Sequence, residues 1–443
     1  MNTTLSAILL LSVPGCSLLL AFPALHSRLP CPWSCYVALL PALVLLAVPT
    51  VVSLDLPWLL LGSGLGIGGA SRWLLAMSVV VWASAATLLH APAGQPEDSR
   101  FTTFFMLSLA GNLGVILATD LVGFFAFSTL MGYSFYGLLV NAGNRAARRA
   151  GRVYLGLLIL ADLALFEALL IAAATAGDLN GDLSFGGVRQ AMAQSATPGL
   201  YLSMVLVGFA LKAGAWPLHF WLPPAFRSAR LAVALLLGGV PVAIGLLGAV
   251  RWLPLGEIAL PDLGLIIQGL GVVAMLYAIM AGLMRAQRKT LPAYAAIVAT
   301  GLFVTALGVG LADPAVWNQY ENQAHFFIVF LGPGLAVLTV GTGWWKERNP
   351  YSDAPAKQDD DSAPWFERWP GAVARWAGQM GFDTLPRLRA AWLAEVGCLR
   401  PIRAWQRSLD RSERFLRRWS LAITLFLLFG MVVAFVGALS WSG

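Results

Sequence analysis

A lysine inside an apolar segment is the residue of this sequence that most clearly points to chemistry. Lys212 lies in an apolar run that begins near Leu200, and Pro217 follows it closely. An ammonium group at membrane depth costs roughly 2.5–3.5 kcal/mol, so such residues usually face a bundle interior or a wet cavity. Because proline lacks a backbone donor, we expect the helix to break at Pro217. A charge beside a helix break is how transporters often build a site for ions.

The residues around this lysine resemble a known family. Residues 208–225 read GFALKAGAWPLHFWLPPA, and the family pattern is close to GFxxKxxxxPLHxWLPxA. The family comprises the antiporter-like membrane subunits of respiratory complex I, Mrp-type cation/proton antiporters, membrane-bound hydrogenases and some inorganic-carbon uptake systems. The resemblance implies that Lys212 lies on a broken helix and relays protons with a glutamate on an earlier helix. His219 matches the histidine of the motif. The alternative is a relic lysine that packs against backbone carbonyls.

Two departures from the family pattern concern its charged residues on the fifth and eighth spans. In FFAFSTLM, residues 124–131, Thr129 takes the place of the key glutamate. A threonine hydroxyl can bind a water, but it cannot hold a titrating proton at neutral pH or supply the negative charge that keeps a buried lysine protonated. Ala243 stands where the family has a second lysine, in a span for which we expect a break at Pro241. The usual transfer from the first lysine to the second has therefore lost its receiver.

Two carboxylates are candidates to replace the missing glutamate. Residues 153–177 read VYLGLLILADLALFEALLIAAATAG, with Asp162 and Glu167 well inside. Carboxylates at this depth are costly and tend to be functional. Five residues correspond to about 140° around a helix, so the two do not share a face. Either could pair with Lys212. Alternatively, one forms a salt bridge with an arginine of a neighbouring subunit, or burial keeps it protonated.

Two further residues match family positions and complete the set of candidates for an ion or proton pathway. Residues 287–301, QRKTLPAYAAIVATG, resemble DLKRxLAYSSISxxG, and Lys289 matches a lysine of that motif. His325 matches the histidine of HAFFKAxLFLxxG. A lone histidine at a helix start is more often a packed or hydrogen-bonded group than a relay, so both interpretations of His325 stay open.

Composition identifies the fold class that must position these residues. Of 443 residues, 58% are hydrophobic and 12% are charged, against about 25% charged residues in average soluble chains. Long apolar runs recur along the chain, which predicts an all-α integral membrane protein with about twelve transmembrane helices. The expected spans are 5–22, 33–52, 72–90, 101–118, 119–141, 152–176, 199–217, 229–252, 262–284, 292–312, 322–344 and 420–441.

The resemblance implies a division of the chain. We expect N-terminal helices (1–100), a five-helix antiporter-like repeat with a broken helix (101–252), a truncated second repeat (253–345), a polar linker with an amphipathic, interfacial or lateral segment (346–419), and a C-terminal transmembrane anchor (420–443). Residues 54–71 should be a non-helical, Gly-rich connection. The linker assignment rests on the Pro, Asp and Ser content after Trp345.

Charge placement predicts orientation and surroundings. The net charge of +7 comes mostly from arginines in loops and in the tail, which suits the positive-inside rule and contact with anionic lipids. Three basic loops alternate onto one side, which we interpret as cytoplasmic. The prediction is a multi-pass protein of the bacterial inner membrane. Nothing in the pattern favours a nucleic-acid partner.

The sequence shows no pattern for a cofactor or a metal. We find no Fe–S cysteine spacing, no dinucleotide-binding glycine motif after a strand and no convincing pair of haem ligands. His26, Cys31 and Cys35 give three candidate ligands where zinc needs four, so we interpret the cysteines as thiols at a loop edge. We expect no self-contained catalytic site, and any oxidoreductase activity would belong to a complex.

Two functions remain open. In the first, the chain is a subunit of a multi-subunit complex and moves protons or Na+ near Lys212, with other membrane subunits as partners. In the second, it is a non-conducting scaffold that anchors a cytosolic enzyme, in an inorganic-carbon uptake system or a redox or hydrogenase module, or dimerises with a fuller antiporter-like homologue. Thr129 and Ala243 favour the second function.

Overall fold

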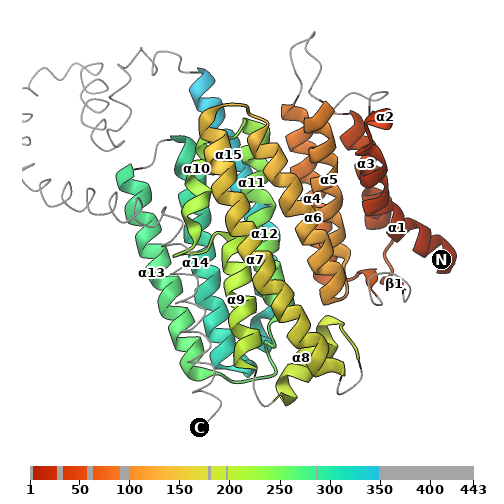
Figure 1. Cartoon of the computed structure of the whole chain (residues 1–443), viewed down its shortest axis with the longest axis vertical. Helices are drawn as coiled ribbons and strands as arrows, with labels where there is room; N and C mark the ends of the chain where they lie inside the picture. The colour runs from red at the N-terminus through yellow and green to blue at the C-terminus, as the bar shows by residue number, and fades with distance from the viewer. Residues whose placement is uncertain are drawn as a thin grey trace, which may run out of the picture.

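A bundle of long helices forms the molecule (Figure 1). The computed structural model describes residues 3–26, 33–56, 63–89, 99–177, 181–195, 198–285 and 288–348. In these ranges eight helical segments are long and apolar enough to cross a membrane. They are α4 (Gly69–Leu88), α5 (Ser99–Leu117), α6 (Leu121–Val140), α7 (Arg145–Gly177), α11 with α12 (Leu231–Gly239 and Pro241–Trp252), α13 (Pro261–Arg285), α14 (Leu291–Ala312) and α15 (Pro314–Arg348).

Three shorter apolar helices accompany these spans: α1 (Thr3–Leu20), α3 (Trp33–Ala47) and α9 (Gly199–Ala213). A single turn, α2 (Pro23–His26), follows α1. The prediction of an all-α membrane protein is confirmed, and each of the first eleven expected spans has a helical counterpart. The expected anchor at 420–441 and nearly all of the expected linker and tail, 346–419, lie outside the described residues.

The structure also contains elements that the sequence analysis did not predict. An amphipathic helix, α8 (Phe185–Gln194), fills the connection between α7 and α9. Strands β1 (Val52–Asp55) and β2 (Gly64–Ile67) pair antiparallel where we expected a non-helical, Gly-rich connection. These short elements lie outside the predicted spans, and hydropathy gives no signal for them.

Asp120 ties the hairpin to the bundle. Its carboxylate accepts a hydrogen bond from the backbone N–H of Gly123 at 2.7 Å and so caps the first turn of α6. The second oxygen accepts from the N–H of Gly64 in β2, also at 2.7 Å. A carboxylate at a helix N-terminus satisfies an otherwise unpaired donor and suits the helix dipole. Asp120 therefore has a structural role, although it is buried and charged.

Arg251 caps the C-terminal end of α5, the helix that precedes α6. Its guanidinium donates to the carbonyl oxygens of Val115 at 2.8 Å, Ile116 at 3.0 Å and Ala118 at 3.3 Å. These carbonyls belong to the end of α5, where helical backbone acceptors have no intrahelical partner. A cation at this position also complements the helix dipole. The arginine thus fixes α12 to α5.

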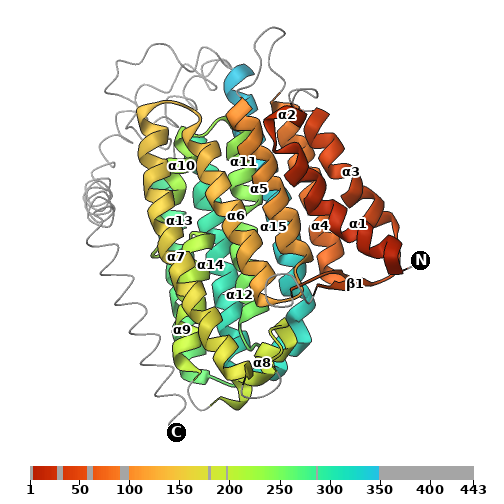
Figure 2. The same cartoon turned by 45° about the vertical axis from the view of Figure 1, so that its right-hand side comes forward.

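The helices lie side by side in chain-local groups. α1 and α3 pack at one flank against α4 and α5, and α13 and α14 pack together at the other (Figures 1 and 2). α7 and α12 both pack against α9, which carries Lys212. Gly245 permits the approach of α12, since a Cβ there would lie 2.6 Å from the backbone nitrogen of Ala213. Small residues at such crossings let membrane helices come close.

Candidate functional site

The helix that carries Lys212 ends one residue later. α9 stops at Ala213, and Gly214 adopts a left-handed conformation with φ 64°. A short 3-10 turn, η1 (His219–Trp221), and the helix α10 (Leu222–Ser228) follow. The indole N–H of Trp221 donates to the carbonyl oxygen of Leu211 at 3.1 Å. This bond satisfies one of the acceptors that the end of a helix exposes, which matters where no water competes.

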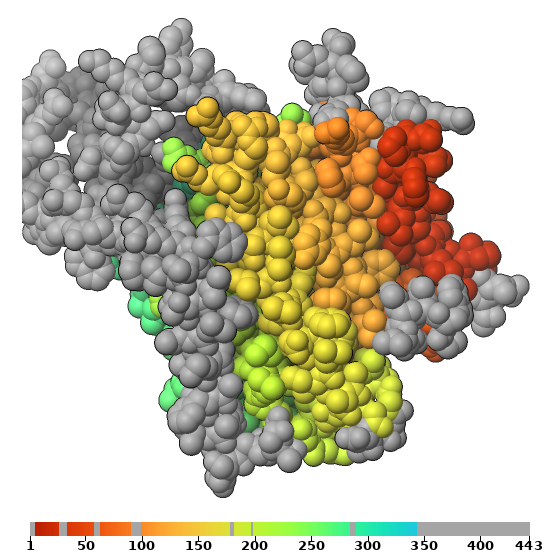
Figure 3. Space-filling view, in the orientation of Figure 1, coloured from red at the N-terminus to blue at the C-terminus, as the bar shows by residue number. Residues whose placement is uncertain are grey.

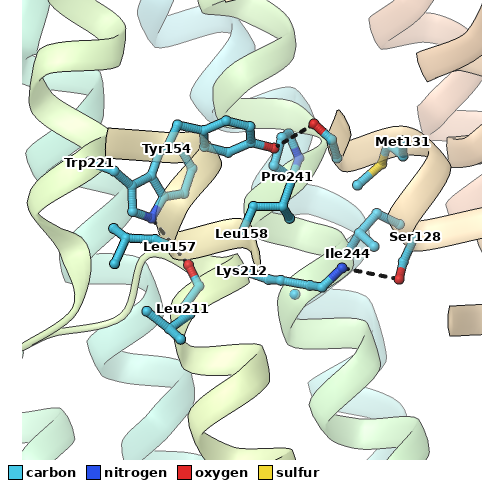
Figure 4. A pocket seen from close by; sticks show the side chains of 12 residues that line it. Ser128, Met131, Tyr154, Leu157, Leu158, Leu211, Lys212, Trp221, Pro241 and Ile244 are labelled. Carbon is cyan, nitrogen blue, oxygen red and sulfur yellow. Dashed lines mark hydrogen bonds between the residues drawn. The ribbon is translucent and has the colours of Figure 1, made fainter. Parts of the chain in front are cut away.

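Lys212 lies in the protein interior between three helices. The residue is 8% exposed. Its Nζ lies 2.7 Å from Oδ1 of Asp162 on α7 and donates a hydrogen bond to Oγ of Ser128 on α6 at 3.2 Å. Figure 4 shows the contact with Ser128. A buried ammonium is stable only where an opposite charge and acceptors surround it, and here both are present.

A small cavity adjoins the ion pair. It offers about 20 Å³ of space for water, and Ser128, Tyr154, Lys212 and Trp221 are among its lining residues (Figure 4). That is roughly the space that one water molecule needs. Neither oxygen of Asp162 accepts a well-directed hydrogen bond within the described ranges, so the contact with Lys212 is an ion pair by proximity. The carboxylate therefore retains acceptor capacity, and Lys212, not Asp162, lines the cavity.

The structure distinguishes the two carboxylate candidates. Asp162 is 7% exposed and faces Lys212, whereas Glu167 lies on the exposed side of α7. The two side chains point in different directions because five residues turn a helix by about 140°. Of these two, only Asp162 has a position from which it can act on the lysine of the same chain.

Ser128 is a site residue that the sequence analysis missed. Thr129, which aligns with the family glutamate, is half-buried, and its hydroxyl has no hydrogen-bond partner among the residues that the structure describes. Ser128 instead accepts from Lys212 and donates to the carbonyl of Phe125 at 3.1 Å. Adjacent helical positions differ by about 100°, so only one can face the lysine. The two adjacent hydroxyl residues, Ser128 and Thr129, indicated this part of α6 as polar. The sequence did not indicate which of the two would face Lys212.

His219 lies beyond the helix break and contacts another helix. It is 1% exposed, and its Nε2 lies 3.1 Å from the hydroxyl of Tyr277 on α13. The two rings also meet edge to face, with centroids 4.9 Å apart. At this distance a hydroxyl and an imidazole form a hydrogen bond, in which one group donates and the other accepts. Tyr277 is a second residue that the sequence motif did not indicate.

The other two pathway candidates are not joined to the ion pair. His325 on α15 donates from Nδ1 to the carbonyl of Glu321 at 3.0 Å and lines a cavity of about 440 Å³ near Arg251. That cavity shares no lining residue with the one beside Lys212. Lys289 is exposed in the turn η2 (Arg288–Thr290). Neither residue has a contact with Lys212 or Asp162 in the described structure.

The helix that follows is apolar where the family has its second lysine. α12 begins at Pro241, which also lines the cavity beside Lys212, and Ala243 is 7% exposed. A separate cavity of about 50 Å³ lies between α9, α12, α13 and α14, and every residue that lines it is apolar. In the described part of the chain, polar groups that could carry a proton lie on the α7 side of Lys212 and next to His219. The cavity of about 50 Å³ has none in its lining.

Comparisons with known proteins show which sequences and which fold this chain resembles. Residues 118–320 match the family model described as NADH:quinone oxidoreductase/Mrp antiporter, TM. Hydrogenase-4 component B of Escherichia coli (strain K12) is 25% identical over 72% of this chain and 50% of the relative. A Na(+)/H(+) antiporter component from Alkalihalophilus pseudofirmus is 27% identical over 56% of this chain and 51% of the relative.

A solved structure shares the fold. The Mrp complex from Dietzia sp. DQ12-45-1b contains a chain that superposes with a TM-score of 0.59 at 20% identity, over 79% of this chain and 38% of that one. The chain described here spans about half the length of the curated relatives that it matches. The matched segment contains the broken helix, the ion pair and the motif around Lys212. In residues 118–320 the chain resembles the antiporter-like membrane subunits shared by NADH:quinone oxidoreductases and Mrp antiporters.

Proposed function

We propose that this chain is a subunit of a multi-subunit membrane complex and moves protons through the pair formed by Lys212 and Asp162. The observation that carries the proposal is the Nζ–Oδ1 separation of 2.7 Å, in the protein interior at the end of a broken helix. Relatives that are named as antiporter and hydrogenase components support the same role. The location that we propose is the bacterial inner membrane, and Na+ is the alternative ion.

The pair can load and release a proton because burial disfavours both charges at once. Transfer of one proton from the ammonium of Lys212 to the carboxylate of Asp162 yields a neutral amine and a neutral acid. No net charge moves out of the pair in that step. The proton can then leave Asp162 through a water molecule, and the amine of Lys212, which lines the cavity, can take up another proton. Ser128 accepts from the ammonium and so favours the loaded form.

His219 and Tyr277 are the next proton carriers in this proposal. They lie on the far side of the break from α9, and their contact at 3.1 Å links η1 to α13. An imidazole can accept a proton on one nitrogen and release one from the other. A water or a motion of the break would have to bridge from the lysine to this pair.

Proton flow into vesicles tests the proposal. The complex that contains this chain is purified with its own partners and reconstituted, a potassium diffusion potential is applied, and an internal dye reports the pH. Lys212→Met should lower the initial rate of proton entry at least tenfold. Arg149→Gln, an exposed substitution at the start of α7, is the matched control and should stay within twofold of the unmodified complex.

A second variant separates loss of conduction from loss of folding. Removal of one partner of a buried ion pair costs about 3–5 kcal/mol, because the other charge stays uncompensated. Lys212→Met together with Asp162→Asn removes both charges, so this double variant should assemble with its partners and still fail to conduct. An assembled complex that conducts at the unmodified rate without Lys212 would disprove the proposed role.

A non-conducting scaffold is the second candidate. The observation that favours it is the apolar environment at Ala243 and around the cavity of about 50 Å³, where a conducting relative would need a receiver. In that case the chain would anchor a cytosolic enzyme, or a fuller antiporter-like subunit, at the membrane. The vesicle experiment distinguishes the candidates, because a scaffold would tolerate the double variant without a change in proton entry.

A further inference from the structure

One face of α7 is apolar, exposed and interrupted by a carboxylate. Ile159, Leu163, Phe166 and Leu170 are 49%, 55%, 44% and 48% exposed. Glu167 is exposed among them. Residues spaced by three or four positions share a helix face, so these five side chains form one stripe, here termed the Glu167 face. Figure 3 shows α7, in yellow, at the surface of the molecule.

The depth of Glu167 makes this face unusual. The apolar part of α7 runs from Val153 to Ala176. At a rise of 1.5 Å per residue, Glu167 lies about 21 Å along the helix from Val153 and about 14 Å from Ala176. This depth is near the middle of a bilayer. Ionisable side chains at that depth almost always face a bundle interior or a wet cavity and find a partner. Glu167 faces outward instead.

The partner is not in the described part of this chain. The ion pairs found there are those of Lys212 with Asp162 and of Arg189 with Glu321, and Glu167 makes neither an ion pair nor a hydrogen bond within those residues. Asp162, on the inner side of α7, pairs with Lys212 of α9. By the same chemistry, Glu167 requires a base from outside the described residues.

We propose that the Glu167 face is the contact surface for a transmembrane helix of a partner subunit, and that this helix carries a lysine or arginine at the depth of Glu167. Charge complementarity commits the face to such a partner, because a carboxylate in a low-dielectric interface is stabilised by a cation. A symmetric dimer through this face would bring two copies of Glu167 together, and like charges at low dielectric repel. The inference rests on the proposed role as a subunit of a complex.

Site-specific photocross-linking in native membranes tests this surface. A photoreactive phenylalanine analogue replaces Leu163 or Leu170 in the full chain, and Leu276, which is 58% exposed on α13, is the matched control. Mass spectrometry should identify a peptide from a different polypeptide, within a transmembrane segment that has Lys or Arg no more than one turn from the cross-link. Leu276 should not capture the same peptide.

Charge exchange gives the second arm. Glu167→Lys should lower recovery of the cross-linked subunit at least fivefold during purification, and exchange of the partner's base for glutamate should restore it. Glu167→Leu should also lower recovery, whereas a lipid-facing position would tolerate leucine. Cross-links only to lipid, to a second copy or to residues 349–443 of the same chain would overturn the proposal, and so would normal recovery with Glu167→Leu.

The outcomes separate this inference from the proposed conduction. Lys212→Met together with Asp162→Asn should leave recovery of the partner unchanged while proton entry falls. The complex that combines Glu167→Lys with glutamate in place of the partner's base should assemble and conduct protons. A complex that assembles through the Glu167 face but never conducts would contradict the proposed function alone.

Discussion

At the scale of single residues, the molecule keeps a lysine charged with a different set of groups from the family pattern. The negative charge comes from Asp162 on α7, and the hydroxyl of Ser128 on α6 replaces part of what a glutamate on α6 would supply. Loss of the charged partner costs more than loss of the hydroxyl, since breaking a buried ion pair costs about 3–5 kcal/mol and a hydrogen bond to a charged group is worth about 1.5–3 kcal/mol. The position of the acid has therefore moved between helices while the lysine has stayed.

The adjacent hydroxyls on α6 give a matched residue-scale prediction. Ser128→Ala removes an acceptor from Lys212 and should lower proton entry at least tenfold, because tenfold corresponds to about 1.4 kcal/mol and a hydrogen bond to a charged group is worth about 1.5–3 kcal/mol. Thr129→Val removes a hydroxyl that makes no hydrogen bond in the described structure and should leave the rate within twofold. The vesicle assay measures both. Equal effects at the two positions would mean that the orientation of α6 is not as the structure has it.

At the scale of helices, close packing holds the ion pair in place. Gly245 on α12 lies against the backbone of Ala213, next to Lys212. Any side chain there would push α12 away from the end of α9, because its Cβ would lie 2.6 Å from a backbone nitrogen. Packed interiors absorb such volume poorly, and overpacking costs about 1–3 kcal/mol. The break after Ala213 thus depends on a glycine more than thirty residues later in the chain.

Two glycine substitutions test this packing. Gly245→Ala should lower thermal stability by several degrees and reduce proton entry, because α9 and α12 must separate. Gly269→Ala, at an open position on α13, is the control and should leave stability unchanged or raise it, since alanine is favoured over glycine in a helix by about 0.5–1 kcal/mol. Thermal unfolding of the purified complex reports both. A stabilising Gly245→Ala would show that the helices have room there.

Periodicity and hydropathy predicted most of the helices but not the details of the site. The first eleven spans, the sequence motif at Lys212 and two carboxylates on α7 all follow from residue types that are costly or favourable in a membrane. The choice between Asp162 and Glu167, and between Ser128 and Thr129, depends on how α6 and α7 rotate about their axes. That rotation is set by packing between helices, of α6 against α5 and α7 and of α7 against α9, and the local sequence does not encode it. The hairpin at β1 and β2 is too short and mixed to predict.

At the scale of the whole molecule, basic residues collect at one end of the bundle. α10, with exposed Arg227, lies at the opposite end from α8 (Figures 1 and 2). α7 leads toward α8, so its start, with Arg149, lies at the α10 end, and η2 with Lys289 packs against α10. The positive-inside rule then predicts that this end faces the cytoplasm.

Cysteine labelling tests this orientation. In a variant without the native cysteines, Arg149→Cys should react with a membrane-impermeant maleimide only in inside-out vesicles. Gln190→Cys, exposed on α8, should react with the same maleimide only from the non-cytoplasmic side. Intact cells whose outer membrane has been made permeable to the reagent present that side. The reverse pattern would place the α10 end outside and would invert the direction of entry to the pair.

The 2.7 Å between Nζ of Lys212 and Oδ1 of Asp162 also limits electrical control. One elementary charge that crosses the full membrane gains about 2.3 kcal/mol per 100 mV, and the hydrocarbon layer is about 30 Å thick. A proton that hops between these two atoms crosses at most about a tenth of the field, which is about 0.2 kcal/mol and below thermal energy. Voltage can therefore drive a current through the protein, but it hardly decides which of the two atoms holds the proton.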